Sequence, residues 1–287
     1  MSIVVMKFGG TSLGDVNKLS NISRKIQEIV DLNKKVVAVV SAMGDTTDKL
    51  VKEYSKLSSC RFNSDYDNVV SAGEQISAGM LSSLLNERRI KSTSFLGWQV
   101  PIKTDKSFGK ARILEIPKEN ILKMLKYNDV IVISGFQGVT SDNRITTLGR
   151  GGSDTSAVAI AASISAEICE IYTDVEGIFT ADPRDVPKAK KISHITYEEI
   201  LEMSSLGSKV LQPRSVELAM KYAIKVHVRS SFSKKIGTLV IKEGKRLEKE
   251  VVTGISSSDD DSKITLIGIS DIPGVASKIF SPLADAN

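Results

Sequence analysis

The sequence predicts an α/β protein with a mainly parallel sheet that helices cover on both faces. Two observations support this fold class. Strand candidates alternate with helix candidates along most of the chain. The candidate at Lys35–Ser41 (KVVAVVS) is a continuous apolar run, which is typical of a strand buried on both faces. The 287 residues allow one large domain or two smaller ones.

The elements follow in order from local periodicity. Strands are expected at Ile3–Phe8, Lys35–Ser41, Thr93–Leu96, Val130–Ser134, Glu170–Thr173 and Lys225–Val228. Helices are expected at Val16–Ile29, Thr47–Leu57, Ser64–Arg89 (with Met80, Leu81, Leu84 and Leu85 on its inner side), Pro117–Lys126, Ser153–Ser165, Tyr197–Met203 and Arg214–Tyr222. Between Phe136 and Leu148, the polar turn at Ser141–Asn143 predicts a hairpin.

The composition changes after Ile241. A charged run (KEGKRLEKE) leads to a strand candidate at Val251–Ile255, and then come SSSDDDS, KITLIGIS and a short helix ending at Asn287. We therefore expect a domain boundary near Lys242, which gives units 1–241 and 242–287. The second unit has too little core to be a complete domain. We expect either a shortened chain or a segment that packs on a partner.

Charge and composition exclude several function classes. The net charge is +5, aromatic residues make up 5%, and the basic residues are spread along the chain, so nucleic acid is not an expected partner. The apolar N-terminal run is too short for a signal peptide or a membrane span. Cys60 and Cys169 belong to no CxxC pair, and His194 and His227 lack further soft ligands. These residues predict a reducing compartment, by default the cytoplasm, and no protein-held metal.

The segment from Leu148 to Arg184 is the most informative part of the chain. LGRGGSD is a glycine turn that leads into a helix, whose unpaired N–H groups and positive dipole end favour an anion. Downstream, IYTDVEGIF reads as a strand that ends at Thr173 and Asp174. Because ligands gather at the carboxyl ends of strands in α/β proteins, these two residues are expected to face a ligand.

A second glycine turn follows the first strand. Lys7, before Gly9 and Gly10, could place its ammonium on phosphate oxygens while the glycine N–H groups approach closely. The turn at Ser41–Gly44 repeats this arrangement, and the two turns would form one anion-binding floor. A surface lysine before a tight turn is the alternative interpretation of Lys7. Neither a Walker A loop nor a dinucleotide fingerprint is present.

Other charged residues complete a candidate site, and each has an alternative interpretation. Glu74 could bind an ammonium group or be a solvated helix residue, and Arg150 could hold a carboxylate, so the pair would suit an amino acid. Asp154 could serve as an N-cap or as a first-turn acid, neither of which excludes catalysis. Lys209 is a further phosphate-binding candidate or a surface lysine beside a helix.

Seven segments in order resemble the aspartokinase family. They are KFGGTS at Lys7, SAMGDTTDKL at Ser41, SAGEQISAGML at Ser71, GFQG at Gly135, LGRGGSDTSA at Leu148, YTDVEGIFTADPR at Tyr172 and LGSKVLQPR at Leu206. The resemblance implies the amino-acid kinase fold, a three-layer α/β/α sandwich, over Lys7 to about Arg229. DIPGVASKIFSPLADAN at Asp271 resembles the opening of an ACT regulatory domain. Unit 242–287 would then be a linker with an incomplete ACT-like α+β segment.

The resemblance also implies a reaction and the residues that carry it. The reaction is ATP-dependent phosphorylation of the side-chain carboxylate of L-aspartate to 4-phospho-L-aspartate, which leads to lysine, threonine and methionine. The implied catalytic residues are Lys7, Asp154 and Lys209. The implied aspartate-binding residues are Ser41, Thr47, Glu74, Arg150 and Ser153. The implied nucleotide-binding residues are Lys7, Gly9, Gly10, Thr173, Asp174, Phe179, Arg184 and Lys209.

Cofactor and partner expectations follow from the same resemblance. ATP would arrive with Mg²⁺, which the nucleotide phosphates would mainly hold. A homodimer or a larger homo-oligomer is expected, and feedback by lysine or threonine only in a full-length protein. Gln212, Phe179 and Ser156 depart from the residues that the family usually has, which affects nucleotide preference or rate more than the reaction. The alternatives are a sibling kinase for glutamate, acetylglutamate, carbamate or UMP, and a non-catalytic regulatory subunit.

Overall fold

The computed structural model describes residues 2–59, 62–208, 210–242, 252–257 and 273–286. The described strands are β1 (Ile3–Phe8), β2 (Lys35–Val40), β3 (Ser92–Phe95), β4 (Lys103–Thr104), β5 (Ile113–Glu115), β6 (Val130–Ser134), β7 (Gln137–Val139), β8 (Ile145–Thr147), β9 (Ile168–Thr173), β10 (His194–Thr196), β11 (Val226–Ser230) and β12 (Thr238–Ile241). The described α-helices are α1 (Val16–Val30), α2 (Thr46–Leu57), α3 (Ser64–Val70), α4 (Ala72–Glu87), α5 (Lys118–Tyr127), α6 (Gly152–Ser163), α7 (Tyr197–Ser205), α8 (Pro213–Tyr222) and α9 (Val275–Ala286). A 3-10 turn spans Gly10–Leu13.

The main sheet has eight strands in the order β10-β12-β11-β9-β1-β2-β6-β3. All neighbouring pairs are parallel except β11 with β12. The chain builds one side of β1 with β2, β3 and β6 and then crosses to the other side with β9. Such a reversal of strand order opens a crevice at the carboxyl ends of the strands, where α/β proteins bind ligands.

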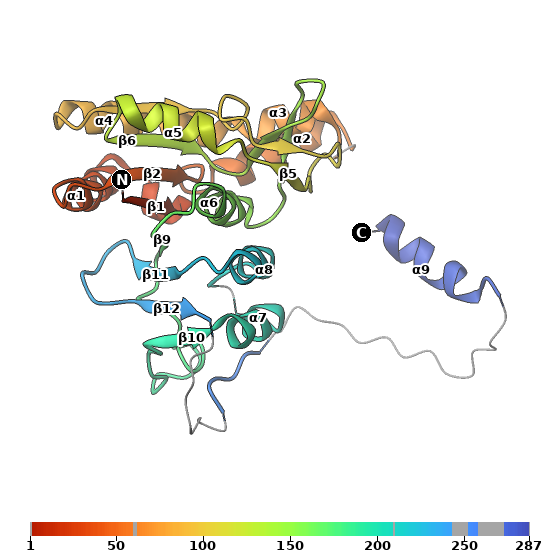
Figure 1. Cartoon of the computed structure of the whole chain (residues 1–287). Helices are drawn as coiled ribbons and strands as arrows, with labels where there is room; N and C mark the ends of the chain where they lie inside the picture. Colours follow the sequence, from red (N-terminus) through yellow and green to blue (C-terminus); the bar gives the residue numbers. More distant parts are fainter. Residues whose placement is uncertain (1, 60–61, 209, 243–251, 258–272, 287) are drawn as a thin grey trace. The chain divides into compact units, whose positions relative to one another are not determined.

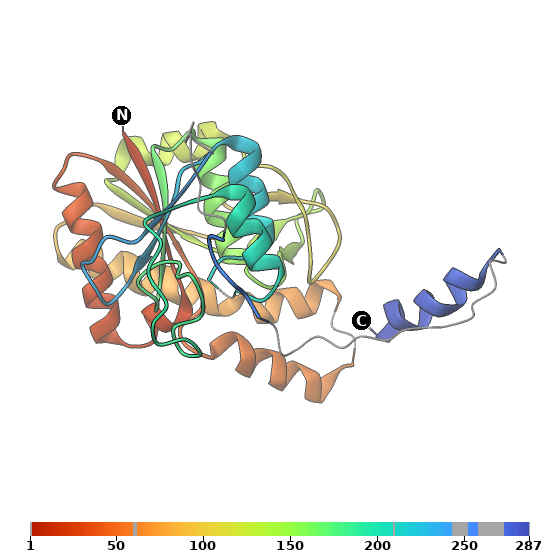
Figure 2. The ribbon, with the colours of Figure 1, turned by 90° about the horizontal axis from the view of Figure 1, so that it is seen from below.

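Helices cover both faces of this sheet. Figure 1 shows α6, α7 and α8 on one side of the strands and α1 on the other, and Figure 2 shows the same separation from below. Alternate residues of β1 enter different cores: Ile3 and Val5 pack with Val158 of α6, whereas Val4 and Met6 pack with the α1 and α4 side chains. This confirms the expected α/β fold with a mainly parallel sheet covered on both faces.

Helix starts follow the capping residues of the sequence. Asp15 caps α1 by accepting the Lys18 N–H at 2.9 Å, and Asn63 caps α3 by accepting the Tyr66 N–H at 2.8 Å. Thr196 begins α7 with a capping box.

A smaller sheet of four strands, in the order β5-β4-β7-β8, stands beside the main sheet. Its strands β7 and β8 are antiparallel and form the predicted hairpin, which leads directly into the glycine turn before α6. The sheet therefore determines where that turn begins.

Several predictions about elements were wrong. The long helix expected at Ser64–Arg89 is two helices, α3 and α4, which meet at Ser71. Met80 is 40% exposed, whereas Leu81 and Leu85 are buried, because Met80 lies outside the stripe of α4 that faces the sheet. Residues 252–255, expected as part of a strand, lie outside regular secondary structure. The short strands β4, β5, β10 and β12 were not predicted.

The chain divides into two compact units, Met1–Ser257 and Ser258–Asn287. The first unit extends past the expected boundary at Lys242 because the Thr253 hydroxyl donates to Glu199 at 2.8 Å and the Ile255 N–H donates to Thr180 at 2.8 Å. In the second unit the described part is the helix α9, where a short helix was expected. The stretch KITLIGIS lies outside the described residues.

Candidate functional site

The carboxyl ends of four neighbouring strands meet at one edge of the main sheet. Phe8 at the end of β1 is in register with Val40 of β2 and with Tyr172 of β9, and Val40 is in register with Ser134 of β6. The segments that directly follow these strands therefore lie along the same edge. They are Gly9–Gly10, Ser41–Gly44, Gly135 and Asp174.

A buried ion pair connects β1 to the start of α6 at this edge. Lys7 Nζ lies 2.5 Å from Asp154 Oδ1, and the two side chains are 12% and 10% exposed. The alternation of β1 directs Lys7 to the same face as Ile3 and Val5, where α6 packs. The interpretation of Lys7 as a surface lysine is therefore wrong.

Asp154 is the third residue of α6, and Gly151 occupies the N-cap in the left-handed conformation at φ +67°. Asp154 is thus a first-turn acid and not the N-cap. Its carboxylate is well placed electrostatically, since acids are favoured at the positive end of a helix. The Asp154 carboxylate also pairs with the Lys7 ammonium, so Asp154 can fix where that ammonium lies.

The two glycine turns are in direct contact. The Gly44 N–H donates to the Gly10 carbonyl at 3.0 Å, and a Cβ added to Gly10 would lie 2.7 Å from the Ala42 carbonyl oxygen. Only a glycine fits at position 10 without moving backbone. A Cβ on Gly9 would lie 3.5 Å from Lys7 Nζ, so the Lys7 ammonium sits just above the Gly9 backbone. The expected juxtaposition of the two turns is confirmed, and anion binding there stays a prediction.

Glu74, in the first turn of α4, is buried beside the second of these turns. Its side chain is 3% exposed, and its Oε1 accepts the Ala42 N–H at 3.0 Å. Its Oε2 is also buried and has no hydrogen-bond partner among the described residues. Burial raises the pKa of Glu74 to about 7, and the Ala42 N–H offsets part of that effect. The interpretation as a solvated helix residue is wrong, because a buried and half-satisfied carboxylate needs a further donor.

The glycine loop holds the other acceptor-side candidates. Gly149 and Gly151 are both left-handed, at φ +79° and +67°. Arg150 between them is exposed and makes no hydrogen bond or ion pair with a described residue. Ser153 is buried against Gly135, where an added Cβ would come within 2.8 Å of the Ser153 side chain. Arg150 is thus available to a ligand.

Ser41 and Thr47 flank the second glycine turn. The Ser41 N–H donates to the Phe8 carbonyl at 3.1 Å, which places Ser41 immediately beyond the end of β2. Thr47 lies in the first turn of α2. Both side chains are half-buried, and the structure brings both to the same turn as the Ala42 N–H that holds Glu74.

The residues expected to hold the nucleotide follow β9. The Thr173 hydroxyl donates to Asp174 Oδ1 at 2.9 Å, at the carboxyl end of that strand. Phe179 is half-buried, and its backbone pairs with that of Lys191 in an isolated antiparallel β-bridge. Arg184 is exposed and pairs with Asp182 at 2.6 Å, which raises the pKa of Arg184. Lys209 lies outside the described residues, and its expected role stays a prediction.

Three contributors to the site escaped the sequence interpretation. Ala42 contributes only its backbone, through its N–H to Glu74 and its carbonyl beside Gly10. Gly135 has no side chain and so leaves room for Ser153. The Gln137 amide donates to the Ser71 carbonyl at 2.8 Å, at the junction of α3 and α4. Gly135 and Gln137 belong to the GFQG segment, to which sequence reasoning assigned no role. Their signal is a glycine directly after a buried strand, which marks a close approach of backbone.

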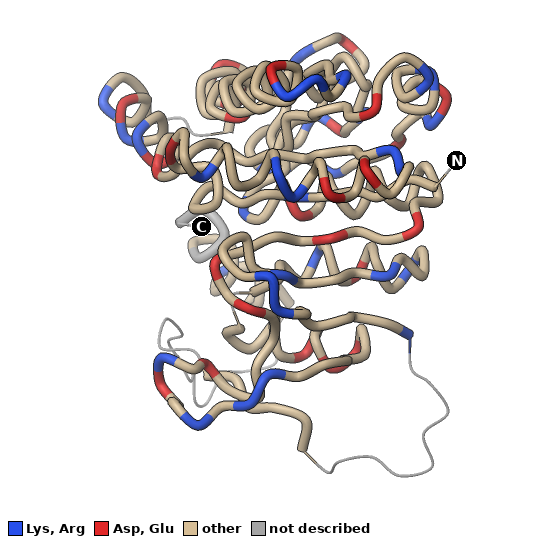
Figure 3. The backbone as a smooth tube through the Cα atoms, turned by 90° about the vertical axis from the view of Figure 1, so that its left-hand side faces the viewer, with Lys and Arg blue, Asp and Glu red and all other residues tan. Residues whose placement is uncertain are grey.

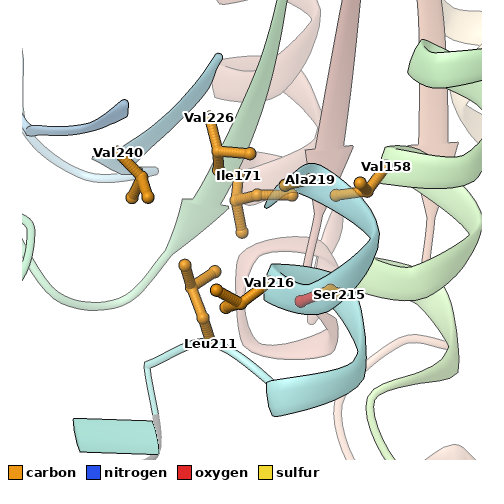
Figure 4. A pocket seen from close by; sticks show the side chains of 8 residues that line it. All are labelled: Val158, Ile171, Leu211, Ser215, Val216, Ala219, Val226 and Val240. Carbon is orange, nitrogen blue, oxygen red and sulfur yellow. The ribbon is translucent and has the colours of Figure 1, made fainter. Parts of the chain in front are cut away.

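A small cavity lies away from this edge, between α6, α8 and strands of the sheet (Figure 4). Its volume is about 10 Å³, the lower limit for a single water molecule. It is lined by Val158, Ile171, Leu211, Ser215, Val216, Ala219, Val226 and Val240. The one polar group, the Ser215 hydroxyl, donates to the Gln212 carbonyl at 2.7 Å. The cavity is a packing gap in the core and does not offer a phosphate site.

The described part of the chain offers few features that compete with this edge of the sheet. It contains no cluster of three or more His, Cys, Asp and Glu side chains arranged to hold a metal ion. No helix in the described ranges is both long and apolar enough to cross a membrane. Basic and acidic residues are interspersed along the backbone on the face that Figure 3 shows. The site at the carboxyl edge of the sheet is therefore the strongest candidate.

Comparisons with known proteins agree with this location. The model of the amino acid kinase family matches residues 2–230. The chain is 44% identical to an aspartate kinase of Stutzerimonas stutzeri over 288 aligned positions, covering 100% of this chain and 70% of that protein. It is 44% identical to an aspartokinase of Thermus thermophilus, covering 99% of this chain and 70% of that protein.

Solved structures give the same result. Aspartokinase III of E. coli, in complex with aspartate and ADP, superposes with a TM-score of 0.77 at 29% identity, covering 85% of this chain and 65% of that one. The aspartate kinase of Synechocystis superposes with a TM-score of 0.74 at 41% identity, covering 88% of this chain and 41% of that one. A UMP kinase of Bacillus anthracis, at 20% identity and a TM-score of 0.62, shares the fold.

Proposed function

The chain belongs to the aspartokinases of the amino acid kinase family and is an aspartate kinase, and on that premise we propose how its residues divide the reaction. We propose that it transfers the γ-phosphoryl group of ATP to the side-chain carboxylate of L-aspartate, giving 4-phospho-L-aspartate and ADP. The product would enter the biosynthesis of lysine, threonine and methionine. The chain spans about two thirds of the length of the relatives it matches.

One observation carries this division of roles. The Ser41–Gly44 turn contacts both halves of the site: its Ala42 N–H holds Glu74, and its Ala42 carbonyl closely approaches Gly10. Glu74 offers a buried, unpartnered oxygen to an ammonium group, and Gly10 lies just beyond the strand that carries Lys7. A site for an amino acid and a site for a phosphoryl group therefore share one turn.

The acceptor side is proposed to bind the two charged groups on the α-carbon of the amino acid. Glu74 would bind the α-ammonium group, and Arg150 would bind the α-carboxylate in bidentate fashion. Ser153, Ser41 and Thr47 would add hydroxyl contacts. This leaves the side-chain carboxylate free to approach the phosphorus atom.

The donor side is proposed to neutralise charge. The attacking carboxylate has an ordinary pKa of about 4, so it is ionised at neutral pH and needs no general base. As the new carboxylate O–P bond forms, the bond from the γ-phosphorus to the bridging oxygen breaks and ADP leaves with that oxygen. Lys7 and Lys209, with the Gly9 and Gly10 N–H groups, would stabilise the charge of the transferred group. Asp154 would hold Lys7 in position.

The nucleotide is proposed to lie along the segment after β9. Thr173 and Asp174 would hold its sugar and phosphates, Phe179 would contact its base, and Arg184 would exchange its exposed contact with Asp182 for a phosphate. Mg²⁺ would be held mainly by the nucleotide phosphates. The metal would supply charge neutralisation when bound.

The remaining expectations also stay proposals. We propose a homodimer or larger homo-oligomer, an ACT-like character for unit 242–287, and a cytoplasmic location. Feedback by lysine or threonine is proposed for a protein with complete ACT modules.

Trapping of the acyl phosphate tests the proposed reaction. The protein is incubated with ATP, Mg²⁺ and L-aspartate in the presence of hydroxylamine, and the aspartyl hydroxamate is measured. Glutamate, acetylglutamate, carbamate and UMP serve as competing acceptors in a parallel panel. ADP formation is measured with every acceptor, because phosphorylation of UMP gives no acyl phosphate for hydroxylamine to trap. Product with aspartate alone is the expected result. Absence of product with aspartate, or a preference for another acceptor, would contradict the proposal.

A further inference from the structure

Asp67 is a buried carboxylate for which the proposed reaction has no use. It lies on α3, its exposed fraction is 0%, and it makes no ion pair with a described residue. Burial raises the pKa of Asp67, and hydrogen bonds from Gly109 and Thr147 lower it in part. An unpaired carboxylate in a protein interior is costly, so its hydrogen bonds must matter to the structure around it.

Those hydrogen bonds all go to two loops that border the acceptor site. The Thr147 N–H donates to Asp67 Oδ2 at 2.7 Å, and the Thr147 hydroxyl donates to Oδ1 at 2.8 Å. The Gly109 N–H lies 3.0 Å from both oxygens. Thr147 ends β8, three residues before Arg150.

The Arg214 guanidinium donates hydrogen bonds to carbonyl groups of the same two loops. Arg214, in the first turn of α8, donates to the Leu148 carbonyl at 2.9 Å and to the Ala111 carbonyl at 2.8 Å. The Ala111 N–H in turn donates to the Thr147 carbonyl at 2.9 Å. Asp67 thus accepts hydrogen bonds from N–H groups of the paired loops, and Arg214 donates hydrogen bonds to their carbonyl groups.

These contacts fix the base of the glycine loop, and the Gly152 N–H closes its tip by donating to the Gly149 carbonyl at 2.9 Å. Leu148 is held through its carbonyl by Arg214 and through its N–H by the Phe136 carbonyl at 2.9 Å. Gly149 closely approaches the Gly109 carbonyl, where an added Cβ would lie at 3.2 Å. The Arg150 side chain has no partner among the described residues, and residues 147–149 help to set where the Arg150 backbone lies.

Asp67 also connects this loop to the other acceptor residue. It lies seven residues before Glu74, across the junction of α3 and α4 at Ser71. Gln137 holds that junction through the Ser71 carbonyl at 2.8 Å, and the Ser134 hydroxyl donates to the Glu74 carbonyl at 3.2 Å. The segment that carries Glu74 is therefore joined through Asp67 to the loop that carries Arg150.

We propose that Asp67 is a positioning residue that sets the distance between Arg150 and Glu74 and thereby the affinity for the amino-acid substrate. This inference rests on the proposed roles of Arg150 and Glu74. The structure supports it because, among the described residues, every hydrogen bond to the Asp67 carboxylate comes from Thr147 or Gly109. Arg214 acts on the same pair from the α8 side.

Asp67→Asn tests the proposal with little change of shape. An amide retains one acceptor oxygen and turns a donor toward the N–H groups of Gly109 and Thr147, so the loop must shift. We expect KM for aspartate to rise tenfold or more, while KM for ATP changes less than twofold. Asp65→Asn is the matched control on the same helix, because Asp65 is 80% exposed and pairs at the surface with Arg144. The control should leave both constants within twofold of wild type.

A double-mutant cycle separates positioning from general structure. If Asp67 acts through Arg150, then Asp67→Asn should raise KM for aspartate by less than twofold in an Arg150→Ala background. Additive effects in the cycle would overturn the proposal, as would an unchanged aspartate KM in the single variant. Wild-type protein that forms no hydroxamate would instead contradict the proposed function itself.

Thr147→Val keeps the proposal testable if Asp67→Asn does not fold. This change removes one donor to Asp67 and retains the backbone N–H and the side-chain volume. We expect a three- to fivefold rise in KM for aspartate, while KM for ATP stays within twofold of wild type. An unchanged aspartate KM in a folded Thr147→Val protein would overturn the proposal.

Discussion

The Lys7 ammonium and the Asp154 carboxylate lie 2.5 Å apart, where the end of strand β1 meets the first turn of helix α6. The pair joins the central strand of the sheet to the helix whose N-terminus faces the site. Both side chains are nearly buried, so the ion pair is only weakly screened by solvent. It fixes a cation at the point where the strand order reverses and where the proposed phosphoryl group would bind.

Lys7→Ala should therefore lower kcat by a hundredfold or more, since loss of one preorganised charge at a transferred phosphoryl group costs about 3 kcal/mol. Asp154→Asn should lower it by a similar factor, because the ammonium would lose its anchor. The measurement is hydroxamate formation at saturating ATP and aspartate. Lys103→Ala, which removes an ion pair that is 50% and 58% exposed, is the control and should retain full activity. Full activity of Lys7→Ala would show that its ammonium does not act in catalysis.

The Glu74 pKa of about 7 predicts a pH-dependent affinity for aspartate. The ammonium group of the substrate needs an ionised Glu74, so KM for aspartate should fall as the pH rises from 6 to 8. Glu74→Gln should raise KM about tenfold to a hundredfold, the cost of a lost charge-assisted hydrogen bond, and should remove this pH dependence. Initial rates over a pH series give both results. A wild-type KM that is constant between pH 6 and 8 would argue against ammonium binding by Glu74.

The same carboxylate predicts a pH-dependent stability of the unliganded protein. The folded-state pKa is raised above the ordinary 4.5, so the folded protein holds this proton more tightly than the unfolded chain. The contribution of Glu74 to the free energy of unfolding is therefore full below pH 4.5 and is lost as the pH rises to about 7. The difference between the two pKa values corresponds to about 3 kcal/mol for a fully buried group.

Glu74→Gln should accordingly be more stable than wild type at pH 8 by up to about 3 kcal/mol, and this advantage should shrink toward pH 5. Denaturant unfolding at several pH values measures the difference. Glu87→Gln, at the exposed end of the same helix, is the control. An advantage of Glu74→Gln that does not vary with pH would mean that Glu74 is not protonated in the folded protein near neutral pH.

The sequence specifies the centre of the main sheet well because β1, β2 and β6 are nearly continuous apolar runs. β1 and β6 begin and end at the predicted residues, and the predicted helices have core-facing residues at helical spacing. The short strands β4, β5, β10 and β12 have two to four residues, which is too few for a period to appear. Their existence depends on pairing with distant segments, which local pattern cannot report.

Some residues of the candidate site could likewise be predicted from local sequence, and others could not. Lys7, Gly10 and Asp154 stand in motifs whose chemistry is local, so sequence reasoning could assign them roles. The burial of Glu74 depends on the Ala42 N–H, 32 residues away. Asp67 carries no local signal at all, since its partners Gly109 and Thr147 lie 42 and 80 residues downstream. Tertiary structure alone brings these residues together.

Gly10 and Gly79 differ in the space available for an added side chain. A Cβ at Gly10 would lie 2.7 Å from the Ala42 carbonyl oxygen, so Gly10→Ala must push apart the turns that form the site. We expect it to lower kcat/KM for both substrates at least tenfold and to destabilise the protein. Gly79, inside α4, has no atom within 4 Å of an added Cβ, so Gly79→Ala should leave activity unchanged and raise stability by about 1 kcal/mol through helix propensity. Activity assays and thermal unfolding of the two variants measure these effects. Equal activity in both variants would mean that the contact between the turns at Gly10 is not required for the reaction, because the same added methyl group would then be tolerated where backbone blocks it.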